Sequence, residues 1–418
     1  MQAGLPIQTN TRTSASLLNR RHLLMAGGLS ATLSLGACAT AAETSAPTPA
    51  APPAPDTSTP QRKWAVQHLR GMLNLLFPSF KADLKTLDEE GIRLDVRQSI
   101  AQGFSGTLPM LVGFGADDPR WEQYHRIIID EAAGKFPVHG LLYGSTPEQD
   151  IAMMRRLEAM GVDLFLLASV NAPDLDNESL YQAMRARIAA TEKPMMIYAA
   201  LGKGRNYPAL GPAGQPLDVF DRLADLPNVT SVKISQPVTL TSTLQICERV
   251  ADRLLVAPVN LDFLPLLARH YHMQWSGQWN AEAIQTPAQQ LGNELLKACA
   301  VRDFDRADAV AMQLQPALDH FFAVQAGAIR NGGHPLQHNK YYVWLSGGNG
   351  GLVPVSPKGA EATIPTLDAP ARAAMRAAFI ASGLTPTDAP EEQFIVGRAA
   401  WDRGVRPGDM SALPRYKA

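Results

Sequence analysis

The sequence predicts a (β/α)8 barrel followed by a C-terminal helical extension. Eight short apolar runs, each followed by an amphipathic stretch, alternate over roughly 230 residues from about residue 64. The runs lack the apolar–polar alternation of a half-exposed sheet, which indicates parallel strands covered on their outer side. No Gly-x-Gly-x-x-Gly motif follows the first run, which disfavours an open dinucleotide-binding sheet.

Each predicted element can be placed along the chain. The strands are expected at 72–78, 107–113, 137–143, 164–169, 194–199, 231–235, 254–259 and 273–277. The helices between them are expected at 92–102, 121–133, 151–160, 179–190, 219–223 and 242–252. The barrel is assigned to residues 61–300 and the extension to 301–418. After the eighth strand, helix patterns are expected at 281–301, 303–318 and 369–382. The segment 331–366 reads as a loop that either caps one end of the barrel or lies on its surface, and its glycine-rich part, Ser346 to Gly351, reads as a flexible connection.

Composition limits the class of protein. Of 418 residues, 46% are apolar, which is ample for a large core. The 38 basic and 39 acidic residues nearly cancel, so no basic excess is available to bind nucleic acid. Three cysteines exclude a disulfide scaffold, and we expect Cys247 and Cys299 to lie reduced in helices.

The first 60 residues read as a targeting segment and a spacer. Residues 19–25, Asn-Arg-Arg-His-Leu-Leu-Met, resemble a twin-arginine export motif, and a short apolar stretch follows. Residues 35–38, Leu-Gly-Ala-Cys, resemble a lipobox, in which Cys38 is lipidated; ordinary cleavage nearby is the alternative. Residues 39–60 are rich in Ala, Pro, Thr and Ser, which is typical of an extended spacer. We therefore expect an exported protein, periplasmic or held at a membrane only by this N-terminal lipid.

A lysine and a tyrosine on consecutive predicted strands carry the candidate chemistry. Lys233 lies on the sixth strand and Tyr198 on the fifth. Burial disfavours the charged amine, so a lysine inside a barrel becomes available as a nucleophile that forms a Schiff base with a ketone. A nearby tyrosine hydroxyl can transfer the protons that this reaction requires. The alternative is a lysine whose amine reaches solvent, beside a tyrosine that packs in the core.

Several segments, in order, resemble one family. They are Phe77-Pro78-Ser79-Phe80 after the first strand, Gly-Ile-Arg-Leu-Asp at 91–95, Gly-Ser-Thr-Pro-Glu at 144–148, the two strands with Tyr198 and Lys233, and the eighth-strand segment 274–280. Between about residues 72 and 297 the chain resembles the dihydrodipicolinate synthase and N-acetylneuraminate lyase family of Schiff-base aldolases.

The resemblance implies a (β/α)8 lyase that needs neither metal nor cofactor and that forms dimers or tetramers. It makes Lys233 the residue that forms an imine with a 2-oxo acid and Tyr198 the proton relay. Trp275 and Ser276 of the eighth strand become candidates for substrate contact, although Trp275 is equally suited to core packing.

The chain also departs from the family pattern. The family's Gly-Thr-Thr-Gly-Glu motif after the second strand is replaced by residues 110–115, Met-Leu-Val-Gly-Phe-Gly, which carry no hydroxyl. Lys203 and Arg205, in the glycine-containing stretch 201–205, are candidates for a replacement anion site or belong to a solvated loop. The chain is therefore either an enzyme for a different carbonyl substrate or a non-catalytic binding lipoprotein that kept the pocket.

Export through the N-terminal segment predicts a mature protein that begins at a lipidated Cys38. Mass analysis of the N-terminal peptide after membrane fractionation checks this expectation. A protein that retains Met1 and stays in the cytoplasmic fraction would contradict it.

Overall fold

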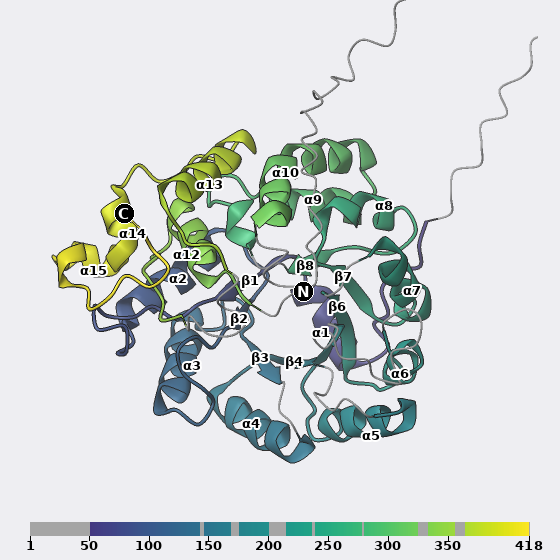
Figure 1. Ribbon diagram of the computed structural model, residues 1–418. Helices are drawn as coiled ribbons and strands as arrows, with labels where there is room; N and C mark the ends of the chain where they lie inside the picture. The colour runs from purple at the N-terminus through teal and green to yellow at the C-terminus, as the bar shows by residue number, and fades with distance from the viewer. Residues whose placement is uncertain are drawn as a thin grey trace, which may run out of the picture. The chain divides into compact units, whose positions relative to one another are not determined.

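The computed structural model describes residues 51–142, 146–168, 175–199, 215–235, 239–277, 280–324, 333–355 and 364–417, which belong to one compact unit. Within it, eight parallel strands surround a central axis and helices form the outer layer, as Figure 1 shows in a view along the barrel. The predicted (β/α)8 barrel with a C-terminal helical extension is confirmed.

The strands are found where the apolar runs predict them, although most are shorter. They are β1 (Gly71–Leu76), β2 (Thr107–Pro109), β3 (His139–Leu142), β4 (Leu164–Ala168), β5 (Met195–Ala199), β6 (Val229–Ile234), β7 (Leu255–Pro258) and β8 (Trp275–Gly277). Hydrogen bonding gives two parallel groups, ordered β2-β1-β8 and β3-β4-β5-β6-β7. Thr107 N–H donates to Pro137 O at 3.0 Å, and the Ser276 hydroxyl donates to Pro258 O at 2.6 Å. These two contacts join the groups and close the barrel.

The outer helices follow the strands as expected. They are α2 (Glu89–Ala101), α3 (Pro119–Ala132), α4 (Pro147–Met160), α5 (Asn177–Ile188), α6 (Leu217–Leu223), α7 (Leu240–Val250) and, after the short η2 (Leu261–Phe263), α8 (Leu264–Ala268). Local capping sets several starts: Thr146 and Gln149 form a capping box at α4, and Asp118, Asp176 and Thr239 each cap a helix through the side chain.

Helix α1 (Pro60–His68) lies against the N-terminal end of the barrel strands. Thr59 caps it and also donates its hydroxyl to Pro227 O at 2.8 Å. Arg62 is 7% exposed and donates to Val229 O, at the start of β6. The last residues of the predicted spacer are therefore attached to the barrel by hydrogen bonds.

The chain after β8 contains the three helices that the sequence predicts, one of them interrupted, and further helices that it does not predict. Its helices are α9 (Leu291–Ala300), α10 (Phe304–Val324), α12 (Leu336–Leu345), α13 (Ala369–Ala381), α14 (Glu391–Val396), α15 (Arg398–Asp402) and the short η5 (Pro407–Asp409). The single helix predicted over 281–301 is wrong, since η3 (Ala281–Ala283) and α9 are separated by a turn. Pro287 lies in this turn, where Thr286 and Gln289 bond to each other, and proline disfavours helix at the preceding residue.

The segment 331–366 is not the loop that the sequence predicts, because it contains α12. Nine of the ten residues of this helix are buried, and Leu336 is partly buried. A helix covered on every side has no polar stripe, so it lacks the periodicity by which a helix is predicted. The glycine-rich part that follows is also fixed in place, and Asn349 within it is 1% exposed.

The buried pair Lys340–Asp95 attaches α12 to the barrel. Lys340 Nζ lies 3.0 Å from an Asp95 oxygen on α2 and 3.0 Å from the Ser79 hydroxyl after β1. Asn349 donates its backbone N–H to Asp95 at 2.6 Å and its side-chain amide to Ser79 at 3.0 Å. These four residues thus satisfy one another through hydrogen bonds.

The segment that contains α12 lies over the C-terminal ends of three strands. Ser79 follows β1, and η3, which contacts α12, follows β8. Gly113 follows β2 with φ +76°, and a Cβ there would lie 2.5 Å from Pro354. Enzymes with parallel barrels carry their active sites at this end, which we call the mouth of the barrel. The extension is therefore part of the mouth.

Two cysteines lie in helices, as the sequence predicts. Cys247 in α7 and Cys299 in α9 are free and buried, and burial raises the pKa of each thiol to about 12.

Among the described residues, no helix combines the length and the apolar character needed to span a membrane.

Replacing Lys340 with Ala is expected to lower the free energy of unfolding by about 3–5 kcal/mol, because Asp95 would remain buried without a counter-charge. Chemical denaturation measures this loss. The matched control is Arg126→Ala, which removes an exposed pair with Glu122 and should cost less than about 1 kcal/mol. Equal losses in the two variants would contradict the assigned role of the Lys340–Asp95 pair.

Candidate functional site

Lys233 and Tyr198 lie side by side in the barrel. They occupy opposed positions in the register of β6 and β5. Lys233 Nζ lies 5.7 Å from the centroid of the Tyr198 ring. Lys233 is 5% exposed, whereas Tyr198 keeps part of its surface accessible. The two predicted catalytic residues are therefore brought together.

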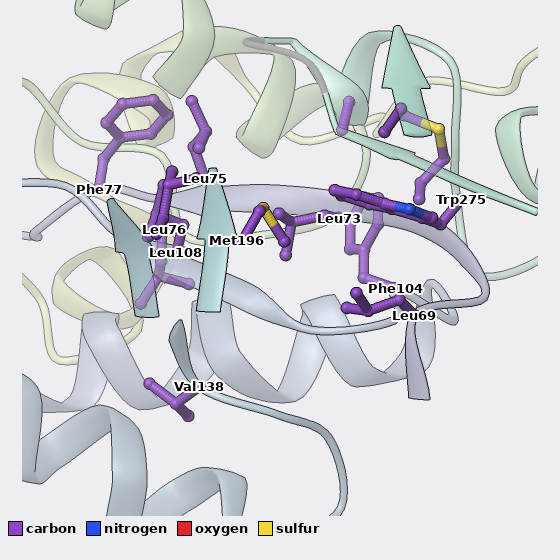
Figure 2. Close-up of a cluster of buried hydrophobic side chains, with 14 of the residues drawn as sticks. Leu69, Leu73, Leu75, Leu76, Phe77, Phe104, Leu108, Val138, Met196 and Trp275 are labelled. Atoms are coloured by element: carbon purple, nitrogen blue, oxygen red, sulfur yellow. The ribbon is translucent and has the colours of Figure 1, made fainter. Parts of the chain in front are cut away.

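An apolar layer closes the barrel interior below this pair. Leu73 of β1, Met196 of β5 and Trp275 of β8 belong to one cluster of buried side chains, shown in Figure 2. Side chains alternate between the two faces of a strand, so Tyr198, two residues after Met196, shares its face. Tyr198 and Lys233 are thus one layer nearer the C-terminal end, where barrel enzymes hold substrates.

Burial alters the protonation of both groups. Desolvation lowers the pKa of Lys233 to about 8, since the charged ammonium is disfavoured in the barrel interior. Desolvation also raises the pKa of the Tyr198 phenol, although a hydrogen bond with the Ser235 side chain opposes the rise. At pH 7 the charged form of Lys233 still predominates, but the fraction present as the neutral amine is far larger than for an exposed lysine, while Tyr198 remains a protonated donor.

His139 is a further titratable group inside the barrel. It is 1% exposed, and neither ring nitrogen has a hydrogen-bond partner among the described residues. Burial, together with a smaller effect of the Lys233 charge, lowers the pKa of His139 to about 3. Strands β3 and β6 are not neighbours, so this charge acts across the interior. Gly106 leaves room for the ring, because a Cβ there would lie 2.8 Å from His139 Nε2.

The end of β2 offers no hydroxyl to a substrate. Val112 is buried, and Gly113 packs against Pro354 of the extension. Where the sequence resemblance would place a threonine pair, the chain therefore makes apolar contacts with a segment that follows α12.

The other predicted site residues divide into two groups. Trp275 and Ser276 are both fully buried: Trp275 packs in the apolar layer, and the Ser276 hydroxyl bonds to Pro258 O. Cys38, Lys203 and Arg205 lie outside the described residues.

A second polar cluster, which the sequence did not reveal, lies beneath α12. Glu282 of η3 accepts a hydrogen bond from the Asn74 amide at 3.1 Å, beside the Lys340–Asp95 pair. These residues line a cavity of about 10 Å³, which is room for about one water molecule. Burial raises the pKa of Glu282 to about 7. No group of three or more His, Cys, Asp or Glu side chains in the described part of the chain is arranged to hold a metal ion.

Comparison with known proteins gives sequence relatives in one family, although no family model matches the chain. The chain is 26% identical over 174 residues to 4-hydroxy-tetrahydrodipicolinate synthase of Rhodopseudomonas palustris (strain BisA53), which covers 40% of this chain and 55% of the relative. It is 24% identical over 234 residues to the enzyme of the same name from Halorhodospira halophila, covering 55% and 73%. The chain thus spans about half the length of the first of these relatives.

Solved structures share the fold over more of the chain. PhdJ bound to a substrate intermediate matches with a TM-score of 0.59 at 17% identity, covering 76% of this chain and 96% of that one. Dihydrodipicolinate synthase from Agrobacterium tumefaciens matches with a TM-score of 0.56 at 16% identity, covering 76% and 99%. The predicted resemblance is confirmed: the chain is similar in sequence to 4-hydroxy-tetrahydrodipicolinate synthases and similar in fold to dihydrodipicolinate synthase.

Proposed function

We propose that this protein is a lyase of the dihydrodipicolinate synthase family that forms a Schiff base between Lys233 and a 2-oxo acid. The observation that carries the proposal is the position of Lys233, buried beside Tyr198 in the barrel with its pKa lowered to about 8. The names of the sequence relatives support a lyase, and the proposal extends this to the imine.

The reaction follows from the two side chains. The neutral Lys233 amine attacks the ketone carbon, and the carbinolamine loses one water to give the imine. Tyr198 returns a proton to the departing oxygen and takes one from the nitrogen. The protonated imine then accepts the electron pair released when a bond to the adjacent carbon breaks, and donates it when a bond forms there.

A binding protein without catalysis is the alternative. The apolar end of β2 favours it, because no hydroxyl is there to hold the substrate carboxylate. Lys203 and Arg205 remain predictions for that contact. Export, lipidation of Cys38 and assembly into dimers or tetramers also remain proposals, drawn from the N-terminal sequence and from the family.

Incubation with pyruvate and borohydride is expected to modify Lys233, since borohydride reduces the imine to a stable secondary amine. Peptide mass mapping locates the reduced adduct. Lys233→Ala should abolish both the formation of this adduct and any turnover of the 2-oxo acid. Lys297→Ala, which changes an exposed lysine, is the matched control and should leave both unchanged. A folded protein that is modified by none of a panel of 2-oxo acids, or a Lys233→Ala variant with full turnover, would overturn the imine mechanism. A ligand bound equally well by Lys233→Ala would favour the binding protein.

The buried amine should also be visible in the pH dependence of stability. Below about pH 8 Lys233 is charged in both the folded and unfolded states, and burial destabilises the folded one. Between about pH 8 and 10.5 the unfolded state binds more protons at this residue, so stability rises with pH. Lys233→Met is therefore expected to exceed the natural protein in free energy of unfolding at pH 7 by up to about 3 kcal/mol, and the difference should shrink towards pH 10.

Denaturation at a series of pH values measures this difference, with Lys297→Met as the exposed control. A difference that does not change between pH 7 and 10 would show that Lys233 titrates normally.

A further inference from the structure

One side of α12 carries buried polar groups that have no partner. At 100° per residue, the ten residues of the helix divide into three sides. Lys340 points to α2, where it meets Asp95. Tyr341 and Trp344 point to α14, where they bond to Glu391 and Gln393. The third side, with His338, Asn339 and Tyr342, makes no side-chain hydrogen bond among the described residues.

Neighbouring elements add to this third side. His320 of α10 has its ring centroid 6.5 Å from that of Tyr342, and its charge acts on His338. Asn280 directly precedes η3, which contacts α12. Both amide atoms of Asn280 and Asn339, both ring nitrogens of His338, His320 Nε2 and the Tyr342 hydroxyl are buried and unpartnered within the described residues. We call Asn280, His320, His338, Asn339 and Tyr342 the α12 wall.

The α12 wall lies at the C-terminal end of the barrel. Asn280 and η3 follow β8, and η2, which contacts α10, follows β7. Lys233 is on β6, next to β7. The wall therefore belongs to the end of the barrel from which a substrate on Lys233 would project.

Leaving so many buried polar atoms without partners is costly, since each typically loses about 1–3 kcal/mol of solvation. Native proteins rarely tolerate this unless a ligand or water completes the set. The α12 wall offers amides, imidazoles and a phenol, which both donate and accept hydrogen bonds.

The side chains of the α12 wall favour a neutral ligand group over an anionic one. Burial lowers the pKa of His338 to about 4 and also lowers the pKa of His320, so both rings are neutral at pH 7. Lys340, the nearest cation on α12, is already paired with Asp95. The charge that raises the pKa of His338 comes from a carboxylate, Asp368, which would repel an anion. A carboxylate or phosphate would bind more tightly where cations are free to pair with it.

We propose that the α12 wall is a specificity subsite that binds the neutral, hydroxyl-bearing tail of the 2-oxo acid held on Lys233. The C-terminal extension would thus supply the polar contacts that the end of β2 lacks. This inference rests on the proposed function, because it takes Lys233 as the attachment point.

The test compares two five-carbon 2-oxo acids, 2-oxo-3-deoxypentonate with hydroxyls on its tail and 2-oxoglutarate with a carboxylate. Borohydride trapping on Lys233 is measured against concentration for each, with pyruvate as the tail-free reference. The natural protein is expected to be trapped by the hydroxylated acid at concentrations at least about tenfold lower than by 2-oxoglutarate.

Asn339→Leu should remove this preference, leave pyruvate trapping unchanged and keep or raise stability, because the amide it replaces has no partner in the described chain. Gln337→Met is the control on another side of α12; it breaks the bond to Val353 N–H at 3.0 Å and should lower stability without changing the preference. A preference that survives in Asn339→Leu, or a natural protein that favours 2-oxoglutarate, would overturn the subsite.

Failure of the subsite can be separated from failure of the proposed function. If pyruvate is not trapped at all, the Schiff-base function falls, and the wall is then tested by calorimetric binding of the same two acids to Lys233→Met. Tighter binding of the hydroxylated acid that is lost in Lys233→Met/Asn339→Leu would support the wall on its own. Equal binding of the two acids would reject it.

Discussion

Closure of eight parallel strands into a barrel is the constraint on which the rest of this structure depends. Closure removes water from the interior, which Leu73, Met196 and Trp275 fill with apolar side chains. A lysine placed above that layer cannot be solvated as it is at a surface, so its pKa falls. The same exclusion of water keeps His139 neutral and Tyr198 protonated. Desolvation by the fold is therefore the largest cause of the pKa shift in all three groups, and at His139 the charge of Lys233 adds to it.

The C-terminal extension changes what this barrel presents at its mouth. Through Lys340, Asp95, Ser79 and Asn349 it is attached to the barrel by a fully buried polar network. A network of this kind tolerates little displacement, because any broken contact leaves a desolvated charge. The extension is thus held in place, and its residue Pro354 packs against Gly113 after β2, where the sequence resemblance would place the threonine motif.

The lack of hydroxyls at the end of β2 and the presence of the extension can be understood together. A barrel mouth that loses hydroxyls on β2 needs other polar groups if it is to hold a substrate in a defined orientation. The unpartnered side of α12 provides such groups from outside the barrel. The two departures from the family pattern would then be one rearrangement of the substrate contacts, made without changing the lysine that carries the chemistry.

The sequence by itself determined the barrel, its eight strands and the lysine–tyrosine pair. Strand and helix patterns are local, and a residue such as Thr146 sets the start of a helix through a hydrogen bond to a residue three positions later. The resemblance around Tyr198 and Lys233 depends on short segments that each lie on one strand.

Only the tertiary structure decided which residues surround the C-terminal end of the barrel. Helix α12 has no amphipathic pattern because three different neighbours bury its three sides, and the sequence therefore predicted a loop there. Lys340 and Asp95 are 245 positions apart along the chain, and nothing local to either one indicates the other. The lowered pKa of Lys233 likewise requires the closed barrel, because desolvation is a property of the packed interior and not of any one segment.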